Sequence, residues 1–268
     1  MEKKLTTTIQ KAISGDRKAL GDVLIEIQDL VYNLSLRMLL YPTEAEDATQ
    51  EILIKIITHL STFKGDSQFS TWVYKIASNY LLTIQSKKAK RMTMSLDEYA
   101  IFIDTGQSKL VEYTSNKGEL SLLEEEVKIS CTHGLLLCLK PMSRVVYILG
   151  ELLELNSYEG AEVLEITPAN FRQQLSRART KIRNFLQQKC GLANPKNPCR
   201  CHKKIDFLAN QDLISIQELK FAKAGTRSLD LLAQITDLEK SVAIYQSTPN
   251  FDLPLNIKKQ IHQLLNLS

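Results

Sequence analysis

Apolar residues recur along much of the chain at intervals of three and four, the spacing that places side chains on one face of a helix. Residues 19–40, 48–60 and 70–80 each carry such a stripe. Tyr41-Pro42 ends the first stripe, and Thr43 with Glu46 predicts a capping box for the helix that follows. No stretch alternates polar and apolar residues convincingly, so the first third of the chain is predicted to be helical.

The helical spacing returns after residue 119 and continues to the end of the chain. Residues 92–119, in between, have weak periodicity and predict a flexible linker, whose apolar run Ala100–Ile103 could dock on a neighbour. The predicted fold class is therefore all-α. The later helical stretches are 120–139, 143–153, 158–164, 168–188, 205–224, 228–245 and 257–267.

Composition bounds the type of protein. The chain has 268 residues, 44% of them apolar and 24% charged, which is an ordinary globular balance and enough for roughly two domains. Apolar runs such as Leu135–Leu139 are far shorter than the roughly 20 residues of a membrane span. The N-terminus lacks the apolar core of a signal peptide. We therefore expect a cytoplasmic protein without membrane insertion.

Charge is segregated along the sequence, although the net charge is only +4. Every charged residue from 75 to 91 is basic. Residues 92–126 contain eight acids against two lysines, and residues 168–204 contain ten basic residues and no acid. Two basic blocks thus flank an acidic connector, a pattern that suggests phosphate-facing surfaces.

The second basic block begins inside a predicted helix-turn-helix. A short helix at 158–164 is followed by three connecting residues, with Thr167 suited to cap the next helix and Pro168 suited to its first position. That helix presents Asn, Gln and Arg side chains, which can pair with base edges in a major groove. The motif alone does not distinguish a recognition helix from a basic surface helix.

Three stretches of the sequence carry a family resemblance. AEDATQE (45–51) with FKGDSQFSTWVYKIASN (63–79) resembles conserved region 2 of bacterial sigma factors of the extracytoplasmic-function (ECF) group, and LSRAR (175–179) resembles region 4 of that group. The resemblance covers roughly residues 10–188. It implies region 2 at 8–91, an acidic linker at 92–119, the region 4 helix-turn-helix at 120–189 and a cysteine-containing helical extension at 190–268.

The resemblance implies a transcription initiation factor that binds bacterial core RNA polymerase, recognises and melts promoter DNA, and is not an enzyme. The residues implied in polymerase binding are Asp47, Gln50 and Glu51. At the −10 element, the resemblance implies aromatic rings and hydroxyl groups that hold extruded bases. It also implies basic side chains that follow the DNA backbone. This −10 set is Ser67, Phe69, Ser70, Trp72, Lys75, Asn79, Lys87, Lys88 and Arg91. For Trp72 we expect burial first and DNA proximity second.

The second recognition surface implied by the resemblance reads the −35 element with the helix that begins at Pro168. Base or groove contacts are expected from Asn170, Arg172, Gln173 and Ser176, and phosphate contacts from Arg177, Arg179 and Lys181. Pro168 and Ala169 complete this set. The acidic linker is expected to run in polymerase channels and to mimic nucleic-acid phosphate.

Two residues depart from the family pattern. Gly160 stands where a large apolar residue is expected, and Glu165 replaces the usual glycine of the turn. A glycine inside a helix costs about 1 kcal/mol relative to alanine. We expect the region 4 fold to survive but its promoter preference to differ.

The extension opens on a loop that contains Cys190, Cys199, Cys201 and His202. Sigma activity requires no cofactor, but these four residues could bind zinc, although their spacing matches no common finger. The same thiols could sense oxidation, or they could be inert in an ordinary loop. An odd count of five cysteines argues against a disulfide framework.

Several questions of function stay open at this stage. A helix-turn-helix regulator that acts without polymerase is the alternative to a sigma factor. A metal-dependent enzyme built on the cysteine loop lacks a general base, a nucleophile and a phosphate loop. Regulation could come from an anti-sigma factor, or in cis if the extension packs on a sigma block.

Overall fold

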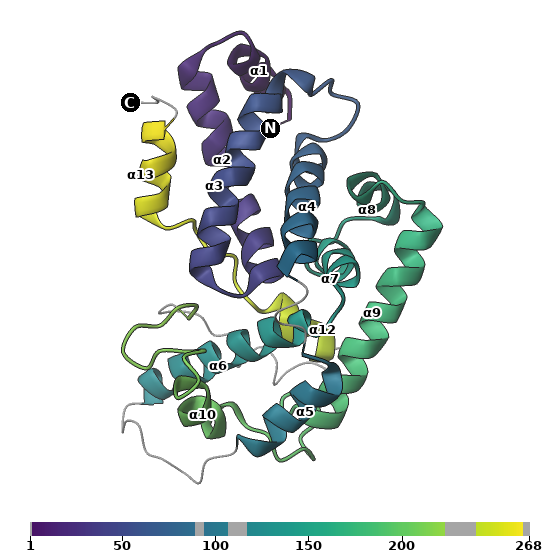
Figure 1. Cartoon of the computed structure of the whole chain (residues 1–268), viewed down its shortest axis with the longest axis vertical. Helices are drawn as coiled ribbons and strands as arrows, with labels where there is room; N and C mark the ends of the chain where they lie inside the picture. The colour runs from purple at the N-terminus through teal and green to yellow at the C-terminus, as the bar shows by residue number, and fades with distance from the viewer. Residues whose placement is uncertain (1, 89–93, 107–116, 223–239, 265–268) are drawn as a thin grey trace. The chain divides into compact units, whose positions relative to one another are not determined.

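The computed structural model describes residues 2–88, 94–106, 117–222 and 240–264, and Figure 1 traces them as helices joined by turns and loops. These residues contain no strand, which confirms the all-α prediction. No helix among them is long and apolar enough to cross a membrane. The α-helices are α1 (Glu2–Ile13), α2 (Arg17–Leu39), α3 (Pro42–His59), α4 (Phe69–Lys88), α5 (Leu96–Thr105), α6 (Lys117–Leu137), α7 (Pro141–Tyr147), α8 (Ser157–Leu164), α9 (Pro168–Lys189), α10 (Ile205–Ala209), α12 (Lys240–Gln246) and α13 (Leu255–Leu264).

Three shorter helical turns accompany them: η1 (Leu60–Thr62), η2 (Ile148–Leu152), which has π-helical geometry, and η3 (Cys201–Lys204). The described chain forms two compact units. The first contains residues 2–88, 155–171 and 250–264, and the second contains 94–106, 117–154, 172–222 and 240–249.

The core of the first unit is formed by the stripes that the sequence predicts. Val31, Ile52 and Val73, from α2, α3 and α4, are completely buried. Asp16 caps α2, where its carboxylate accepts a hydrogen bond from the Ala19 amide at 3.1 Å. The predicted Thr43–Glu46 capping box is wrong: α3 begins two residues earlier than that box implies, at Pro42, and its N-cap residue, Tyr41, makes no side-chain capping bond.

The second unit is arranged around α6. Leu123 and Val127 of α6 pack with Ile205 and Leu208 of α10. Helix α5 lies inside the segment that was predicted to be a linker. The sequence does contain a start signal for this helix, because Ser95 and Glu98 form a complete capping box. Tyr99 and Ile103 bury its apolar face, and the Tyr99 hydroxyl donates to the Cys131 carbonyl at 2.8 Å.

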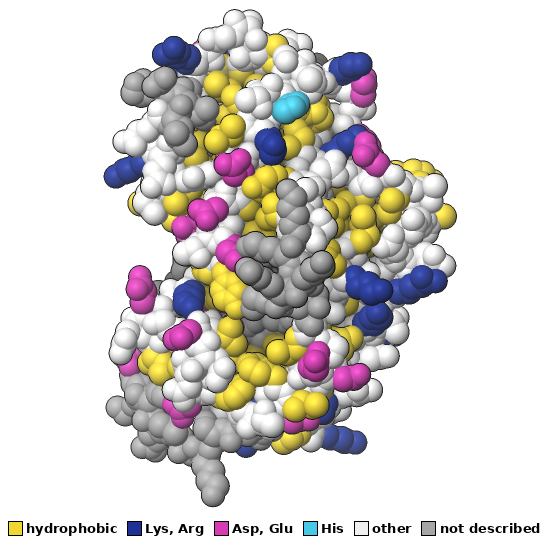
Figure 2. Space-filling model, in the orientation of Figure 1, with side chains coloured by type: hydrophobic (Ala, Val, Ile, Leu, Met, Phe, Trp, Pro, Cys, Tyr) yellow, Lys and Arg dark blue, Asp and Glu magenta, His cyan; other side chains and the backbone are white. Residues whose placement is uncertain are grey.

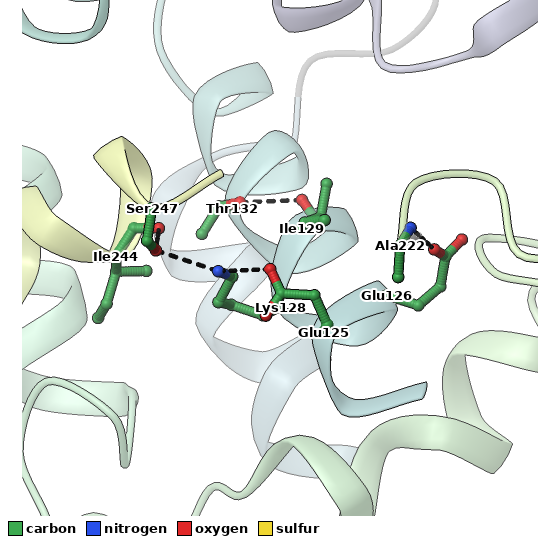
Figure 3. Close-up of polar contacts among 8 residues, drawn as sticks. All are labelled: Glu125, Glu126, Lys128, Ile129, Thr132, Ala222, Ile244 and Ser247. Carbon is green, nitrogen blue, oxygen red and sulfur yellow. Dashed lines mark hydrogen bonds and ion pairs between the residues drawn. The ribbon is translucent and has the colours of Figure 1, made fainter. Parts of the chain in front are cut away.

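The helix predicted over 205–224 is mostly wrong. Over the described residues 205–222 it forms only as α10, and Asp212 adopts a left-handed backbone with φ 56°. The amides of Lys220, Phe221 and Ala222 instead donate to the Glu126 carboxylate at 2.7–2.8 Å. Figure 3 shows the Glu126–Ala222 contact. Of the helix predicted over 228–245, residues 228–239 lie outside the described residues, and the remaining ones lie in α12. Helix α13 confirms the prediction over 257–267 for its described residues.

Candidate nucleic-acid interface

Three aromatic rings gather where the loop after η1 enters α4. Phe69 stacks on Trp72 with ring centroids 5.7 Å apart, and Phe63 lies 5.1 Å from Phe69 and 5.6 Å from Trp72. Phe69 is only 7% exposed, whereas Trp72 is half-buried. The rings therefore support one another and hold the loop in place, and part of the Trp72 side chain reaches the surface.

The same loop borders a groove of about 900 Å³ in the first unit, whose other walls come from α1 and α2. Ser67 and Ser70 line it together with Gln68. Gly65, in the same loop, has φ 81°, a left-handed conformation that suits glycine. Hydroxyl and amide groups thus lie beside a stable aromatic cluster. A cavity of this size and polarity can hold an unstacked base.

Among the basic residues predicted to contact DNA from α4, Lys75 is the one whose side chain is described. The Lys75 Nζ lies 2.8 Å from Glu165 Oε1, in an ion pair whose two side chains are 38% and 64% exposed. Asn79 is exposed one turn further along α4. The side chains of Lys87 and Lys88 are not described, and Arg91 lies outside the described residues.

Helix α9 separates its polar and apolar residues cleanly. Phe171, Ala178 and Ile182 are at most 1% exposed, and Figure 2 shows Lys and Arg side chains gathered over this helix. The guanidinium of Arg179 is paired with the buried Glu151 carboxylate. Pro168 is half-buried, and the exposed residues of the predicted −35 set are Ala169, Asn170, Arg172, Gln173, Ser176, Arg177, Arg179 and Lys181.

The turn before α9 forms as its residues predict. The Asn170 amide donates to the Thr167 hydroxyl at 3.2 Å, which confirms the predicted cap. Glu165 occupies the left-handed position, with φ 54°, that glycine usually takes at a helix end. Gly160 faces the ring of Phe171, which fills the space that a larger residue at 160 would need.

Acidic residues gather on the outer face of α3. Asp47 and Glu51 are exposed, and Gln50 between them is half-buried. Burial and the neighbouring Asp47 raise the pKa of Glu46. Burial raises the pKa of Tyr80, with added contributions from Glu51 and Asp47. A face with this charge favours a basic partner. The sequence did not reveal that Gln50 already donates to Gln260 Oε1, at 2.8 Å, from the C-terminal segment.

The cysteine loop places its residues differently from the predicted ligand set. Cys190, Cys199 and Cys201 line a cavity of about 50 Å³ with Cys131 of α6, which the sequence did not single out. His202 is paired instead with Glu124, 3.0 Å away. Burial raises the pKa of all four thiols, that of Cys131 to about 12. Nowhere in the described parts of the chain are three or more His, Cys, Asp or Glu side chains arranged to hold a metal ion.

Comparison with known proteins places this geometry in a family. The profile of Sigma-70 region 2 matches residues 24–91, which include most of α2, all of α3 and α4, and the aromatic loop. The ECF RNA polymerase sigma factor SigW of Bacillus subtilis is 30% identical over 191 residues, which cover 70% of this chain and 99% of SigW. The chain belongs to the ECF RNA polymerase sigma factors.

Two further relatives agree with that placement. The ECF RNA polymerase sigma-E factor of Escherichia coli is 30% identical over 194 residues, 70% of this chain and 97% of the relative. The RNA polymerase sigma-H factor of Pseudomonas aeruginosa is 26% identical over 182 residues, 67% of this chain and 92% of the relative. This ECF sigma factor is therefore a transcription initiation factor rather than an enzyme, and a regulator that acts without polymerase is not favoured.

Proposed function

We propose that this sigma factor holds core RNA polymerase through α3, reads the −10 element with the loop and helix from Ser67 to Asn79, and reads the −35 element with α9. The proposed layout is region 2 at 8–91, a connector at 92–119, region 4 at 120–189 and the extension at 190–268. The observation that carries this proposal is the groove beside Ser67 and Ser70, within the segment matched by the region 2 profile.

At the −10 element, the groove would receive a base extruded from the non-template strand. Ser67 and Ser70 would hydrogen-bond its edge, while Phe69 offers an apolar wall and Trp72, stacked on Phe69, keeps the loop in shape. Lys75, Asn79, Lys87, Lys88 and Arg91 would follow the DNA backbone. Because Lys75 is paired with Glu165 in the free protein, DNA must compete for it.

At the −35 element, the first turns of α9 would enter the major groove. Asn170, Arg172, Gln173 and Ser176 are exposed there and would contact bases. Arg177 and Lys181, further along, would contact phosphates. Arg179 would contribute least, because it is engaged with Glu151.

Transcription by purified core polymerase on promoters with an intact or a scrambled −35 element tests the α9 assignment. Gln173→Ala should lower initiation on the intact promoter about 5- to 150-fold, which is the cost of a lost bidentate base contact. Gln188→Ala is the matched control, since this exposed glutamine lies near the other end of the same helix. Equal effects of the two substitutions, or equal effects on both promoters, would contradict base reading by Gln173.

The cellular setting is part of the proposal. A factor that works on polymerase acts in the cytoplasm, and the exposed acids of α3 offer an anti-sigma factor the same face as polymerase. Competition between the two partners for Asp47 and Glu51 follows from this overlap. The charge-reversing variant Glu51→Lys should weaken both complexes if they share the face.

The sigma function needs no cofactor, and zinc at the cysteine loop stays a prediction. Cys190, Cys199 and Cys201 share one cavity with Cys131, but His202 is engaged with Glu124, and the described side chains form no metal-binding group. The zinc content of reduced protein tests the prediction. Zinc-free wild-type protein would refute the site.

A further inference from the structure

A stripe of polar side chains on α2 binds the backbone of the C-terminal segment, residues 250–264. The Asn33 side chain donates from Nδ2 to the Phe251 carbonyl at 2.7 Å and accepts the Phe251 amide at Oδ1 at 2.8 Å. Both backbone groups of Phe251 are thus satisfied by one amide, which is itself 4% exposed. Such two-point recognition fixes the register of the segment along the helix.

The neighbours of Asn33 one turn away on either side extend this recognition. Asp29 Oδ1 accepts the Leu253 amide at 2.7 Å and lies 3.3 Å from Lys258 Nζ. Arg37 donates from Nη2 to Asn250 Oδ1 at 3.0 Å. Residues 29, 33 and 37 are spaced by four and therefore share one face of α2. Together, these three side chains bind backbone and side-chain groups of one continuous segment of the chain.

Apolar residues of the segment complete the contact. Phe251, Leu253, Ile257 and Ile261 are at most 7% exposed, and the last two stand four residues apart on one face of α13. Figure 1 shows α13 beside α2 and α3, and the Gln50–Gln260 hydrogen bond connects α13 to α3. Gln50 lies between Asp47 and Glu51, the residues proposed to hold polymerase.

We propose that residues 250–264 are an intramolecular inhibitor that docks on α2, contacts Gln50 of α3 beside the exposed Asp47 and Glu51, and must leave before core polymerase can bind. This inference rests on the proposed role of α3. The occupant is a segment of the same chain, and its chemistry is defined: an extended Asn-Phe-Asp-Leu followed by an amphipathic helix that carries Lys258 toward Asp29.

The polar and apolar parts of the contact contribute differently to its release. Water can solvate the polar side chains of α2 when the segment leaves, so exposure of Phe251, Leu253, Ile257 and Ile261 is the main cost. Arg37 Nη1 is buried without a hydrogen-bond partner among the described residues, and burial lowers the pKa of this guanidinium to about 10. Release would hydrate that group and recover part of the energy of the lost contacts.

The expected change in polymerase affinity follows from the fraction of molecules in which the segment is docked. When only a fraction of molecules is open, the apparent dissociation constant rises by the inverse of that fraction. A segment docked in about nine molecules of ten therefore weakens polymerase binding about tenfold. A substitution that releases the segment should restore that factor without changing any residue proposed to contact polymerase.

Two substitutions in the full-length chain test the inference by measuring the affinity for core polymerase. Lys258→Glu places a carboxylate beside Asp29, and its matched control is Lys259→Glu, an exposed neighbour with the same change of charge. Ile261→Glu removes the apolar anchor, and its control is Leu255→Glu, on the same helix but 74% exposed. The first member of each pair should bind polymerase about tenfold more tightly, and the controls should match wild type.

Amide hydrogen exchange in the same proteins shows whether the inhibitory role of the segment or the proposed role of α3 is wrong. Faster exchange at Phe251 and Leu253 reports that the segment has left α2. Wild-type polymerase affinity in variants that show this release would overturn the inhibitory role. Unchanged polymerase binding by Glu51→Lys, in either background, would overturn the proposed role of α3, whatever the segment does.

Discussion

The ring of Phe171 occupies the space beside Gly160 where any other residue would carry its side chain. A Cβ atom at position 160 would lie 2.3 Å from the Cε2 and Cζ atoms of that ring. Phe171 is completely buried, so the ring has little room to move away. The glycine that departs from the family pattern is therefore matched to an aromatic residue in the first turn of α9, and the two form one packing unit.

Gly160→Ala should lower the free energy of unfolding by about 1–3 kcal/mol, the usual cost of overpacking, although alanine favours a helix. Gly21→Ala is the matched control. Gly21 also lies within a helix, but nothing is within 4 Å of its Cβ position, so the substitution should add about 0.5–1 kcal/mol. Urea unfolding of both variants measures the difference. A stabilised Gly160→Ala protein would contradict the steric argument.

The left-handed turn at Glu165 gives a second prediction. A residue other than glycine costs about 1–2 kcal/mol in that conformation. The ion pair with the partly exposed Lys75 returns only about 0.2–1 kcal/mol. Glu165→Gly should therefore raise the free energy of unfolding by up to about 1 kcal/mol.

Glu165→Gln separates the two contributions, because it removes the charge and keeps the backbone conformation. This variant should lose only a few tenths of a kcal/mol. Denaturant unfolding of the pair provides the measurement. A glycine variant less stable than the glutamine variant would show that the turn carries no strain.

The sequence predicts helices well where periodicity is long, and fails where single side chains decide. The stripes of α2, α3 and α4 specify their buried faces because apolar burial dominates there. Helix α5 was missed because its ten residues carry a weak stripe, although Ser95 and Glu98 form a recognisable capping box. Residues 210–222 lack a helix because a distant carboxylate, Glu126, binds three of their amides.

The candidate sites show the same limit. The basic residues and the turn before α9 are local features, so the sequence predicts them directly. Cys131 joins the cysteine loop from about 60 residues earlier, and Asn33 meets Phe251 across more than 200 residues. No local pattern encodes contacts of that separation. Family resemblance does not supply them either when they involve the extension, which lies outside the matched region 2.

A buried ion pair on α6 carries a third prediction. Lys128 Nζ lies 2.6 Å from Glu125 Oε1 and donates to Ser247 Oγ at 3.1 Å, as Figure 3 shows, and both charged side chains are 1% exposed. Lys128→Met would leave the Glu125 carboxylate buried without its cation, at a cost of about 3–5 kcal/mol.

The double variant Glu125→Met with Lys128→Met removes both charges and should regain most of that stability. A double-mutant cycle from urea unfolding gives the coupling energy. Additive losses in the two single variants would show that the pair is not energetically coupled, contrary to its geometry.

The Glu126 carboxylate makes the stability of the second unit depend on pH. Its Oε1 accepts the Lys220 amide, and its Oε2 accepts the amides of Phe221 and Ala222. Burial raises the pKa of Glu126 above its ordinary value of 4.5, and these three hydrogen bonds and the charge of Lys220 oppose the shift. Between 4.5 and the raised pKa, the folded protein therefore binds more protons than the unfolded chain.

Because the folded state holds the extra proton, stability should fall as pH rises through that window and level off above it. Glu126→Gln abolishes this slope. It should also lower stability at neutral pH by about 1–3 kcal/mol, because its amide group faces a backbone donor and at least one bond is lost. Glu162→Gln, at an exposed position of α8, is the control and should retain the slope. Urea unfolding at a series of pH values measures both effects, and a Glu126→Gln protein with the wild-type slope would assign the titration to another group.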